Sequence, residues 1–220
     1  MPAQILSIDT MLAEHRLWRG QPASRPRGRN PSGHDALDAV LPEGGWPEAA
    51  LTEFLLAADG LGELRLLLPT LARLTQAAQT VAVVAPPYLP FPDGWRQAGV
   101  DLAFVHVIDA APREALWATE QCLRSGCLGA VLAWPRQADD RALRRLQVAA
   151  DGGRTPGFVF RGLREAANPS PAALRIAVEN GAPPRLRVLK CRGGNPPSRT
   201  LELPAIADVA PRAVGDSATR

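Results

Sequence analysis

The sequence predicts an α/β fold with a mainly parallel sheet that ends in an antiparallel hairpin. Two observations lead to this expectation. Short apolar runs alternate with longer helix-like segments through the middle of the chain, and an Asn180-Gly181 pair separates two alternating segments near its end. Alternating strands and helices with short connections are typical of parallel sheets with right-handed crossovers. With 220 residues, 46% of them hydrophobic, the chain can bury a core.

The central block is expected to contain five strands. Continuous apolar runs such as VAVVA and AVLAW indicate strands that are buried on both faces. Pro69 lies early in the first long helix, where it either kinks that helix or marks its true start. His106 lies within an apolar strand and is expected in the core. The expected strands cover residues 51–56, 80–85, 103–108, 129–134 and 157–160, and the expected helices cover 63–79, 113–125 and 139–150.

The two ends of the chain differ from this central block. Residues 1–32 combine a helical segment with a linker rich in Arg and Pro. Residues 33–192 form the predicted core, which opens with a short helix over 34–41. The core closes with a hairpin whose strands, 173–179 and 184–191, flank the Asn-Gly turn. Residues 193–220 are predicted to be a flexible tail, in which the LELPAI segment could dock on a partner.

Composition excludes several classes of protein. The net charge is +3 and the pI is about 9.1, which permits nucleic-acid contact without requiring it. The three cysteines, Cys122, Cys127 and Cys191, are odd in number and lack metal-ligand spacing, so we expect neither a disulfide framework nor a metal site. No apolar run has the length of a signal peptide or a membrane span, and we expect a cytoplasmic protein without membrane contact.

Residues 52–68 have the layout of a phosphate-binding loop without its chemistry. An apolar strand leads into the turn AADGLG, which contains Asp59, Gly60 and Gly62, and an apolar helix is expected to follow. A working loop continues with Gly-Lys-Ser/Thr, because lysine reaches the terminal phosphates and the hydroxyl holds magnesium. Here the positions read Gly62-Glu63-Leu64. The loop amides could attract an anion, but Glu63 is expected to occupy that position itself.

Longer stretches resemble a known family. The segments GHDALDAVLPEGGWPEAALTE, WRQAGVDLAFVHVI and CLRSGCLGAVLAW resemble the core of RecA-type recombinases over residues 33–160. The segments LWRGQ, GGWP, PSPAALR and LKCRGG make the chain similar to the ImuA family, RecA-like proteins of bacterial translesion synthesis. The SulA-like division inhibitors form an overlapping group. The resemblance implies a RecA-like P-loop NTPase core with a degenerate phosphate loop.

This resemblance also implies that the ATPase elements are lost. The catalytic glutamate of such recombinases would fall at Pro86-Pro87, and the magnesium-linked aspartate at Trp134, which Pro135 follows. With Glu63 in the place of the lysine, three separate elements are missing. Phosphoryl transfer depends on these groups, so we expect a protein without catalytic activity and without a cofactor.

The family's function then suggests three hypotheses. The first is a non-catalytic RecA-like adaptor of a bacterial, SOS-induced, error-prone translesion synthesis complex. Its implied partners are ImuB, which resembles a Y-family polymerase, and an error-prone replicative-type polymerase, with RecA or DNA as further candidates. The second is a SulA-like, SOS-induced division inhibitor that binds the tubulin-like division protein. The third, a residual ATPase that regulates recombination filaments, conflicts with the lost residues. Motif chemistry does not separate the first two, but chain length favours the adaptor.

Three basic groups are candidates for contact with DNA or a partner protein. The first group lies on the helix over 139–150, opposite the face formed by Leu143 and Leu146. The second lies in the N-terminal segment, whose helix could instead pack on its own domain or on a second copy. The third follows the last predicted strand. The candidates are Arg141, Arg144 and Arg145; Arg16, Trp18 and Arg19, with Arg25, Arg27 and Arg29 nearby; and Arg187, Lys190 and Arg192, with Arg185 and Arg199 nearby.

Each candidate also has a purely structural interpretation. Arginines on one side of a helix are commonly a solvated face, and charged residues along an edge strand protect a sheet from aggregation. The aromatic loop of residues 88–92, YLPFP, together with Trp95, suits a protein-binding loop. The same loop could instead fold back over the sheet, and the sequence slightly favours this packed arrangement.

Overall fold

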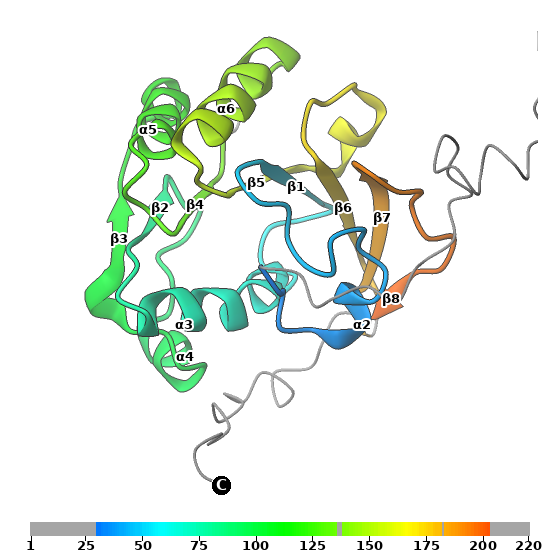
Figure 1. Ribbon diagram of the computed structural model, residues 1–220, viewed down its shortest axis with the longest axis horizontal. Coiled ribbons are helices and arrows are strands. Elements are labelled where there is room, and N and C mark those ends of the chain that lie inside the picture. Colours follow the sequence, from blue (N-terminus) through cyan, green and yellow to red (C-terminus); the bar gives the residue numbers. More distant parts are fainter. Residues whose placement is uncertain (1–29, 136–137, 182, 203–220) are drawn as a thin grey trace, which may run out of the picture.

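One mixed sheet organises the chain. The computed structural model describes residues 30–135, 138–181 and 183–202. Its sheet has eight strands in the order β3-β2-β4-β5-β1-β6-β7-β8. Helices α5 and α6 lie over one face of the sheet, whereas α3 and α4 lie over the other, and β3 and β8 form its opposite ends (Figure 1). This arrangement confirms the predicted α/β fold.

Six of the strands pair in parallel, and the last two strands add two antiparallel pairings. The parallel strands are β1 (Leu51–Leu56), β2 (Val81–Val84), β3 (Val105–Ile108), β4 (Ala130–Ala133), β5 (Gly157–Gly162) and β6 (Leu174–Glu179). Strand β7 (Arg185–Cys191) pairs antiparallel with β6, as the hairpin signal predicted. Strand β8 (Leu201–Glu202) then pairs with the start of β7. It lies within the segment that was predicted to be a flexible tail.

The helices agree with the predicted ones except in the first long segment and at residues 92–97, where the structure has a helix that was not predicted. The structure has α2 (Asp35–Asp38), α3 (Leu68–Gln76), α4 (Pro92–Gln97), α5 (Pro112–Arg124) and α6 (Asp140–Gly153), with 3₁₀ turns η1 (Glu63–Leu66), η2 (Leu102–Phe104) and η3 (Leu163–Ala167). The single helix predicted over 63–79 is therefore η1 followed by a shorter α3. Pro69 lies in the first turn of α3. A proline disfavours helical geometry in the residue before it, so it marks the true start of this helix.

Aromatic side chains form a continuous row in the core on the α3 side of the sheet. Trp46 meets Phe54 and Phe158 edge-on at centroid distances of 5.9 and 5.5 Å. Phe54 stacks on Phe160 at 5.1 Å, and Phe160 stacks on Trp134 at 4.3 Å. Such pairs add about 0.5–1.5 kcal/mol each to the free energy gained by burial. The row links the turn before β1 to the end of β4.

Strand β3 is less buried than the sequence suggested. His106 was predicted to be a core residue, but His106 and Val107 are both exposed. The reason is the position of β3 at the end of the sheet, where it pairs with β2 on one side alone. An apolar run therefore predicted the strand correctly but not its exposure.

His34 lies at the start of α2, between that helix and the η1 turn. Burial lowers the pKa of its imidazole below the ordinary value, whereas the carbonyls of Arg65 and Leu66 and the carboxylates of Asp38 and Asp35 oppose this shift. The folded protein therefore favours a neutral His34. Protonation of this histidine consequently opposes folding.

This burial predicts a pH dependence of stability. Above about pH 7.5, His34 is neutral in both states and its ionisation has no effect on stability. As the pH falls below about 6.5, the unfolded chain takes up the proton first, so stability is lost until the folded protein is protonated too. Urea midpoints at about pH 7.5 and pH 5.5 should therefore differ less for His34→Gln than for the wild type. The exposed His106→Gln variant is the matched control, and equal pH dependence in all three proteins would contradict the prediction.

Candidate functional site

An open pocket lies where four parallel strands of the sheet end. Its volume is about 330 Å³, and it is lined by the residues that follow β1, β2 and β4, the end of β5, and the η3 turn. In open α/β sheets, ligands bind at this carboxyl edge of the strands. The lining residues include Leu56, Ala57, Ala58, Asp59, Ala85, Pro87, Trp134, Pro135, Phe160, Arg161, Gly162, Arg164 and Glu165.

The degenerate phosphate loop borders this pocket and is closed by its own side chain. Glu63 is 4% exposed, and its Oε1 accepts a hydrogen bond from the Gly60 amide at 3.3 Å. Its Oε2 is buried without a hydrogen-bond partner among the described residues. Gly62 adopts φ 89°, a left-handed conformation that favours glycine. The Gly60 amide, which a bound phosphate would need as a donor, therefore donates to Glu63 instead.

The start of the following helix is also unlike that of a phosphate site. A bound phosphate normally meets several amides at the N-terminus of an α-helix. Here the loop enters η1, a 3₁₀ turn of four residues, and α3 begins only at Leu68. The first α-helix after the loop therefore begins six residues beyond Gly62, with Pro69 in its first turn.

The two further catalytic positions that the resemblance implies carry apolar side chains. It places a catalytic glutamate at Pro86-Pro87, and Pro87 lines the pocket after β2 together with Ala85. It places an aspartate at Trp134, which follows β4 and whose ring lies almost parallel to Phe160 at an interplanar angle of 11°. Among the described residues, no group of three or more His, Cys, Asp or Glu side chains could hold a metal ion.

A buried charge network forms one side of the pocket. Glu53, in the middle of β1, is 1% exposed. Its Oε1 accepts a hydrogen bond from Arg161 at 2.5 Å, and its Oε2 accepts one from Arg175 at 2.6 Å. Arg161 also donates to the carbonyl of Ala138 and to Glu165. Each charge is thus paired, as burial requires.

The same network fixes the η3 turn against the sheet. Arg175 donates hydrogen bonds to the carbonyls of Glu165, Ala166 and Asn168 at 2.9, 3.4 and 3.0 Å. The hydrogen bond from Asn168, together with Arg161 and Arg164, lowers the pKa of the Glu165 carboxyl. These residues were not among the predicted site residues. Glu53 could have indicated the network, because a carboxylate within an apolar strand needs a buried partner of opposite charge.

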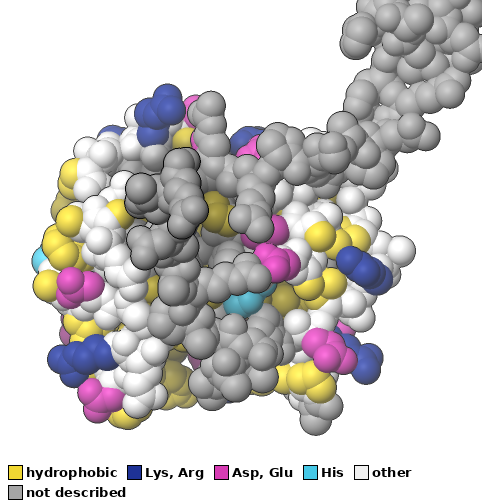
Figure 2. Space-filling model, turned by 60° about the horizontal axis from the view of Figure 1, so that its bottom comes forward, with side chains coloured by type: hydrophobic (Ala, Val, Ile, Leu, Met, Phe, Trp, Pro, Cys, Tyr) yellow, Lys and Arg dark blue, Asp and Glu magenta, His cyan; other side chains and the backbone are white. Residues whose placement is uncertain are grey.

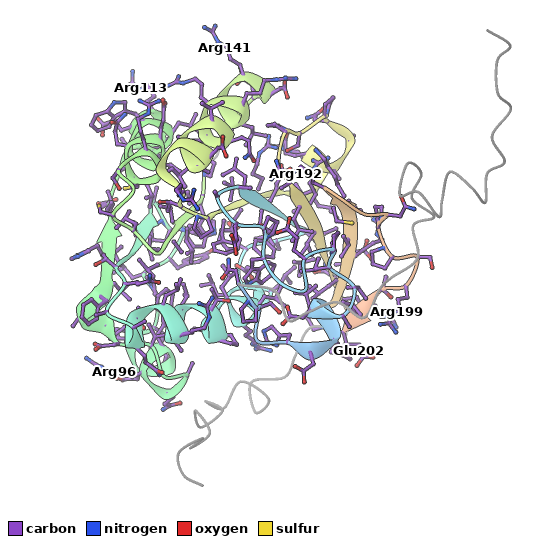
Figure 3. The ribbon with its side chains drawn as sticks, in the orientation of Figure 1. Arg96, Arg113, Arg141, Arg192, Arg199 and Glu202 are labelled. Carbon is purple, nitrogen blue, oxygen red and sulfur yellow. The ribbon has the colours of Figure 1, made fainter. Side chains whose placement is uncertain are left out.

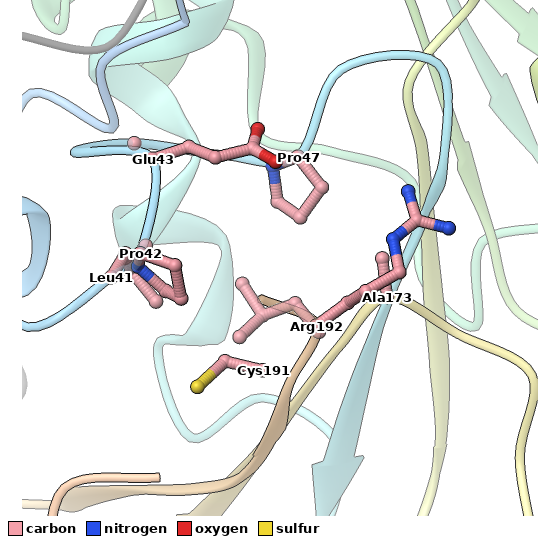
Figure 4. Close-up of a pocket in the computed structure, with 9 residues that line it drawn as sticks. Leu41, Pro42, Glu43, Pro47, Ala173, Cys191 and Arg192 are labelled. Carbon is pink, nitrogen blue, oxygen red and sulfur yellow. The ribbon is translucent and has the colours of Figure 1, made fainter. Parts of the chain in front are cut away.

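The chemistry available in the pocket is therefore limited. Its described lining offers two arginines, two carboxylates and aromatic surface, but no lysine, serine, threonine, cysteine or histidine. Arg161 is already bonded to Glu53 and Glu165. A second crevice, between the GGWP turn and the ends of β6 and β7, is lined by Pro42, Glu43 and Cys191 (Figure 4). It holds about 10 Å³, which is room for about one water molecule.

The predicted basic groups occupy separate places. Arg141, Arg144 and Arg145 are exposed on α6, opposite the buried Leu143 and Leu146, as expected. Arg16, Trp18, Arg19, Arg25, Arg27 and Arg29 lie outside the described residues. At the other end of the sheet, Arg187 is bonded to Glu179 at 2.7 Å, and Lys190 donates to the carbonyl of Ser170 at 2.7 Å. Burial lowers the pKa of Lys190.

The third basic group is thus partly engaged within the fold. Arg192 is exposed, but its backbone amide is bonded to the Ala173 carbonyl at 2.7 Å. On the face that Figure 2 brings forward, the Lys and Arg side chains lie apart from one another rather than in one patch. None of the candidate contact residues that the structure describes lines the pocket beside residues 57–59.

The aromatic loop after β2 is more exposed than predicted. The sequence slightly favoured a packed arrangement, but Tyr88, Leu89 and Phe91 are all exposed. Trp95 alone is buried, because it lies on the inner side of α4 and belongs to the core. The loop leads directly into α4, whose first residue is Pro92. It presents large apolar side chains next to the pocket.

Similarity to known proteins was found among solved structures. No protein-family model and no curated protein matched the sequence. Among solved structures, the chain is similar to SulA from Pseudomonas aeruginosa, with 27% sequence identity and a TM-score of 0.43. The similar region covers 52% of this chain and 98% of that one. Within the described part of the chain, no helix has both the length and the apolar character needed to cross a membrane.

Proposed function

We propose that this chain is a non-catalytic, RecA-like adaptor of a bacterial error-prone translesion synthesis complex. The observation that carries the proposal is the phosphate loop, in which Glu63 takes the place of the lysine and accepts a hydrogen bond from the loop's own amide. A carboxylate near a triphosphate adds a repulsion of about 1–4 kcal/mol and removes the favourable lysine contact. Nucleotide binding is therefore disfavoured at the position where the fold would provide it.

The other catalytic positions support the same interpretation. Ala85, Pro87 and Trp134 offer neither a base nor a metal ligand. A fold without a catalytic base or metal ligands at these positions, but with a packed core, is suited to presenting surfaces to partner proteins. The loop of Tyr88, Leu89 and Phe91 and the unpaired side of β3 are such surfaces.

The partners in this proposal come from the resemblance to the ImuA family. They are ImuB, which resembles a Y-family polymerase, and an error-prone replicative-type polymerase. The adaptor would hold these proteins together after DNA damage, when the SOS response induces them. The chain itself would act in the cytoplasm and require neither ATP nor a metal.

The proposal is tested by deleting the gene and measuring damage-induced mutation frequency beside the parent strain. We expect the deletion to reduce this frequency to the uninduced level, and we expect a plasmid copy to restore it. An unchanged mutation frequency would contradict the adaptor function. Cell length after damage should be recorded in the same cultures, because a loss of damage-induced filamentation would instead favour a division inhibitor.

A further inference from the structure

The outer surface of the α5–α6 pair combines exposed apolar groups with arginines. Trp117 on α5 is 62% exposed, and Val148 on α6 is 69% exposed. A groove of about 250 Å³ lies between the helices. Arg113 and Arg141 both project outward from this side of the molecule (Figure 3). The groove is lined by Glu120, Arg124, Arg141, Arg144, Arg145 and Val148, and we call it the α5–α6 groove.

The groove carries a net positive charge, and ion pairs hold several of its side chains in place. Four arginines line it, against one carboxylate, Glu120, whose side chain is 7% exposed. Glu120 binds Arg124 through Oε1 at 2.5 Å and Arg145 through Oε2, so one buried acid holds an arginine from each helix. Arg144 is paired with Asp140 at 2.8 Å. Among the described residues, Arg141 and Arg113 have no ion-pair partner.

Helical periodicity explains why these residues meet. On α5, Arg113, Trp117 and Arg124 fall on one side of the helix, next to Glu120. On α6, Arg141, Arg145 and Val148 follow the same spacing. The bond between Arg145 and Glu120 fixes these two rows side by side. Val148 thus lines the groove from α6, whereas Trp117 is exposed outside this lining, on the side of α5 that carries Glu120 and Arg124.

We propose that the α5–α6 groove binds an acidic amphipathic segment of a partner protein. Its apolar side would contact Trp117 and Val148, and its carboxylates would pair with the arginines. Amphipathic helices commonly bind in grooves between two helices, and bidentate arginine pairs add specificity. Exposed tryptophan and arginine are also the residue types that dominate binding energy in protein interfaces.

The observations favour a protein over a nucleic acid. Proteins that bind single-stranded nucleic acids without sequence preference use several aromatic side chains, on which successive bases stack, along a basic channel. Among the described residues of this surface, Trp117 is the one exposed aromatic side chain. Its lining carbon surface instead suits an apolar anchor. The inference is independent of the proposed adaptor function, since it concerns a different face from the phosphate loop.

The test uses the purified full chain and a labelled helical peptide of about 15 residues with Leu on one side and Glu on the other. We expect fluorescence anisotropy to show binding at about 50 mM salt that weakens at about 300 mM. Arg141→Glu and Trp117→Ala should each weaken it about tenfold. Both side chains are exposed, so the melting temperature of each variant should equal that of the wild type.

Two controls make the outcome decisive. Arg96→Glu reverses an exposed charge on α4, at the opposite side of the molecule (Figure 3), and should leave binding unchanged. A peptide with Lys in place of Glu should not bind. Absence of peptide binding, or binding that Arg141→Glu leaves intact, would overturn the proposal. It would equally be overturned if an oligothymidine strand bound more tightly than the peptide and lost affinity in the same variants.

Discussion

Replacing Glu53 by alanine is expected to destabilise the protein by about 3–5 kcal/mol, the usual cost of removing one partner from a buried ion network. Arg161 and Arg175 have side chains that are 6% and 8% exposed, and Glu53 pairs with both. Without it, two buried guanidinium groups remain close together, and Arg175 keeps hydrogen bonds to backbone carbonyls but loses the carboxylate that pairs with it. The η3 turn would lose part of its anchor as well. Urea denaturation at neutral pH measures the change in the free energy of unfolding.

Two comparison variants separate this network from a general effect of removing a carboxylate. Glu48→Ala alters an exposed acid before β1 and should change stability by about 0.5 kcal/mol or less. The double replacement Glu53→Leu with Arg175→Leu removes charges of both signs and should cost less than Glu53→Ala. A loss below about 1 kcal/mol for Glu53→Ala would show that the network does not stabilise the sheet.

Phe54→Ala is the second substitution with a large expected effect, a loss of about 3–5 kcal/mol. Phe54 is fully buried at the centre of the aromatic row, where it stacks on Phe160 and Phe158 and meets Trp46 edge-on. Truncation leaves a cavity and removes three aromatic contacts. Because it lies in β1 between β5 and β6, the neighbouring strands cannot close the space without shifting.

The matched control for this cavity is Phe91→Ala. Phe91 has the same ring but lies exposed in the loop before α4, so its removal should change stability by about 0.5 kcal/mol or less. Intrinsic tryptophan fluorescence follows both variants, since Trp46 and Trp134 lie at the two ends of the row. Equal stability losses in the two variants would contradict the account of the core.

Periodicity predicted the parts of the fold that local sequence determines. The strands β2 and β4 were clear because their residues are buried on both faces, and α5 and α6 because their apolar residues recur at helical spacing. The hairpin of β6 and β7 followed from its Asn-Gly turn. The short elements α4, η1, η2, η3 and β8 were missed, since each depends on contacts with distant segments rather than on its own pattern.

Exposure was harder to predict than secondary structure. His106 lies in an apolar strand at the edge of the sheet. The sequence of a single strand does not determine its position in the sheet, so this exposure could not be predicted. Likewise, the exposed loop of Tyr88 and Phe91 depends on where α4 begins. In the folded chain, Arg124 of α5 lines the same groove as the arginines of α6. The sequence did not predict this, because the two helices are separate segments of the chain.

The sequence indicated where the resemblance places the residues of the site, but not how the side chains at these positions are arranged. The positions of the lysine, the glutamate and the aspartate that the resemblance implies fall at Glu63, Pro86-Pro87 and Trp134. The hydrogen bond from Gly60 to Glu63 and the stacking of Trp134 on Phe160 could be seen only in the folded structure. The Glu53 network joins residues more than 100 positions apart, with Arg175 at a separation of 122.

The most direct test of the central claim is the melting temperature of the purified chain with ATP and magnesium. A ligand that binds the folded state raises this temperature, by an amount set by its concentration and affinity. Because Glu63 occupies its own loop, we predict no change at about 1 mM ATP, whether magnesium or a chelator is present. A magnesium-dependent rise of several degrees would show that the loop accepts a nucleotide, and would contradict the account of a protein that has lost this chemistry.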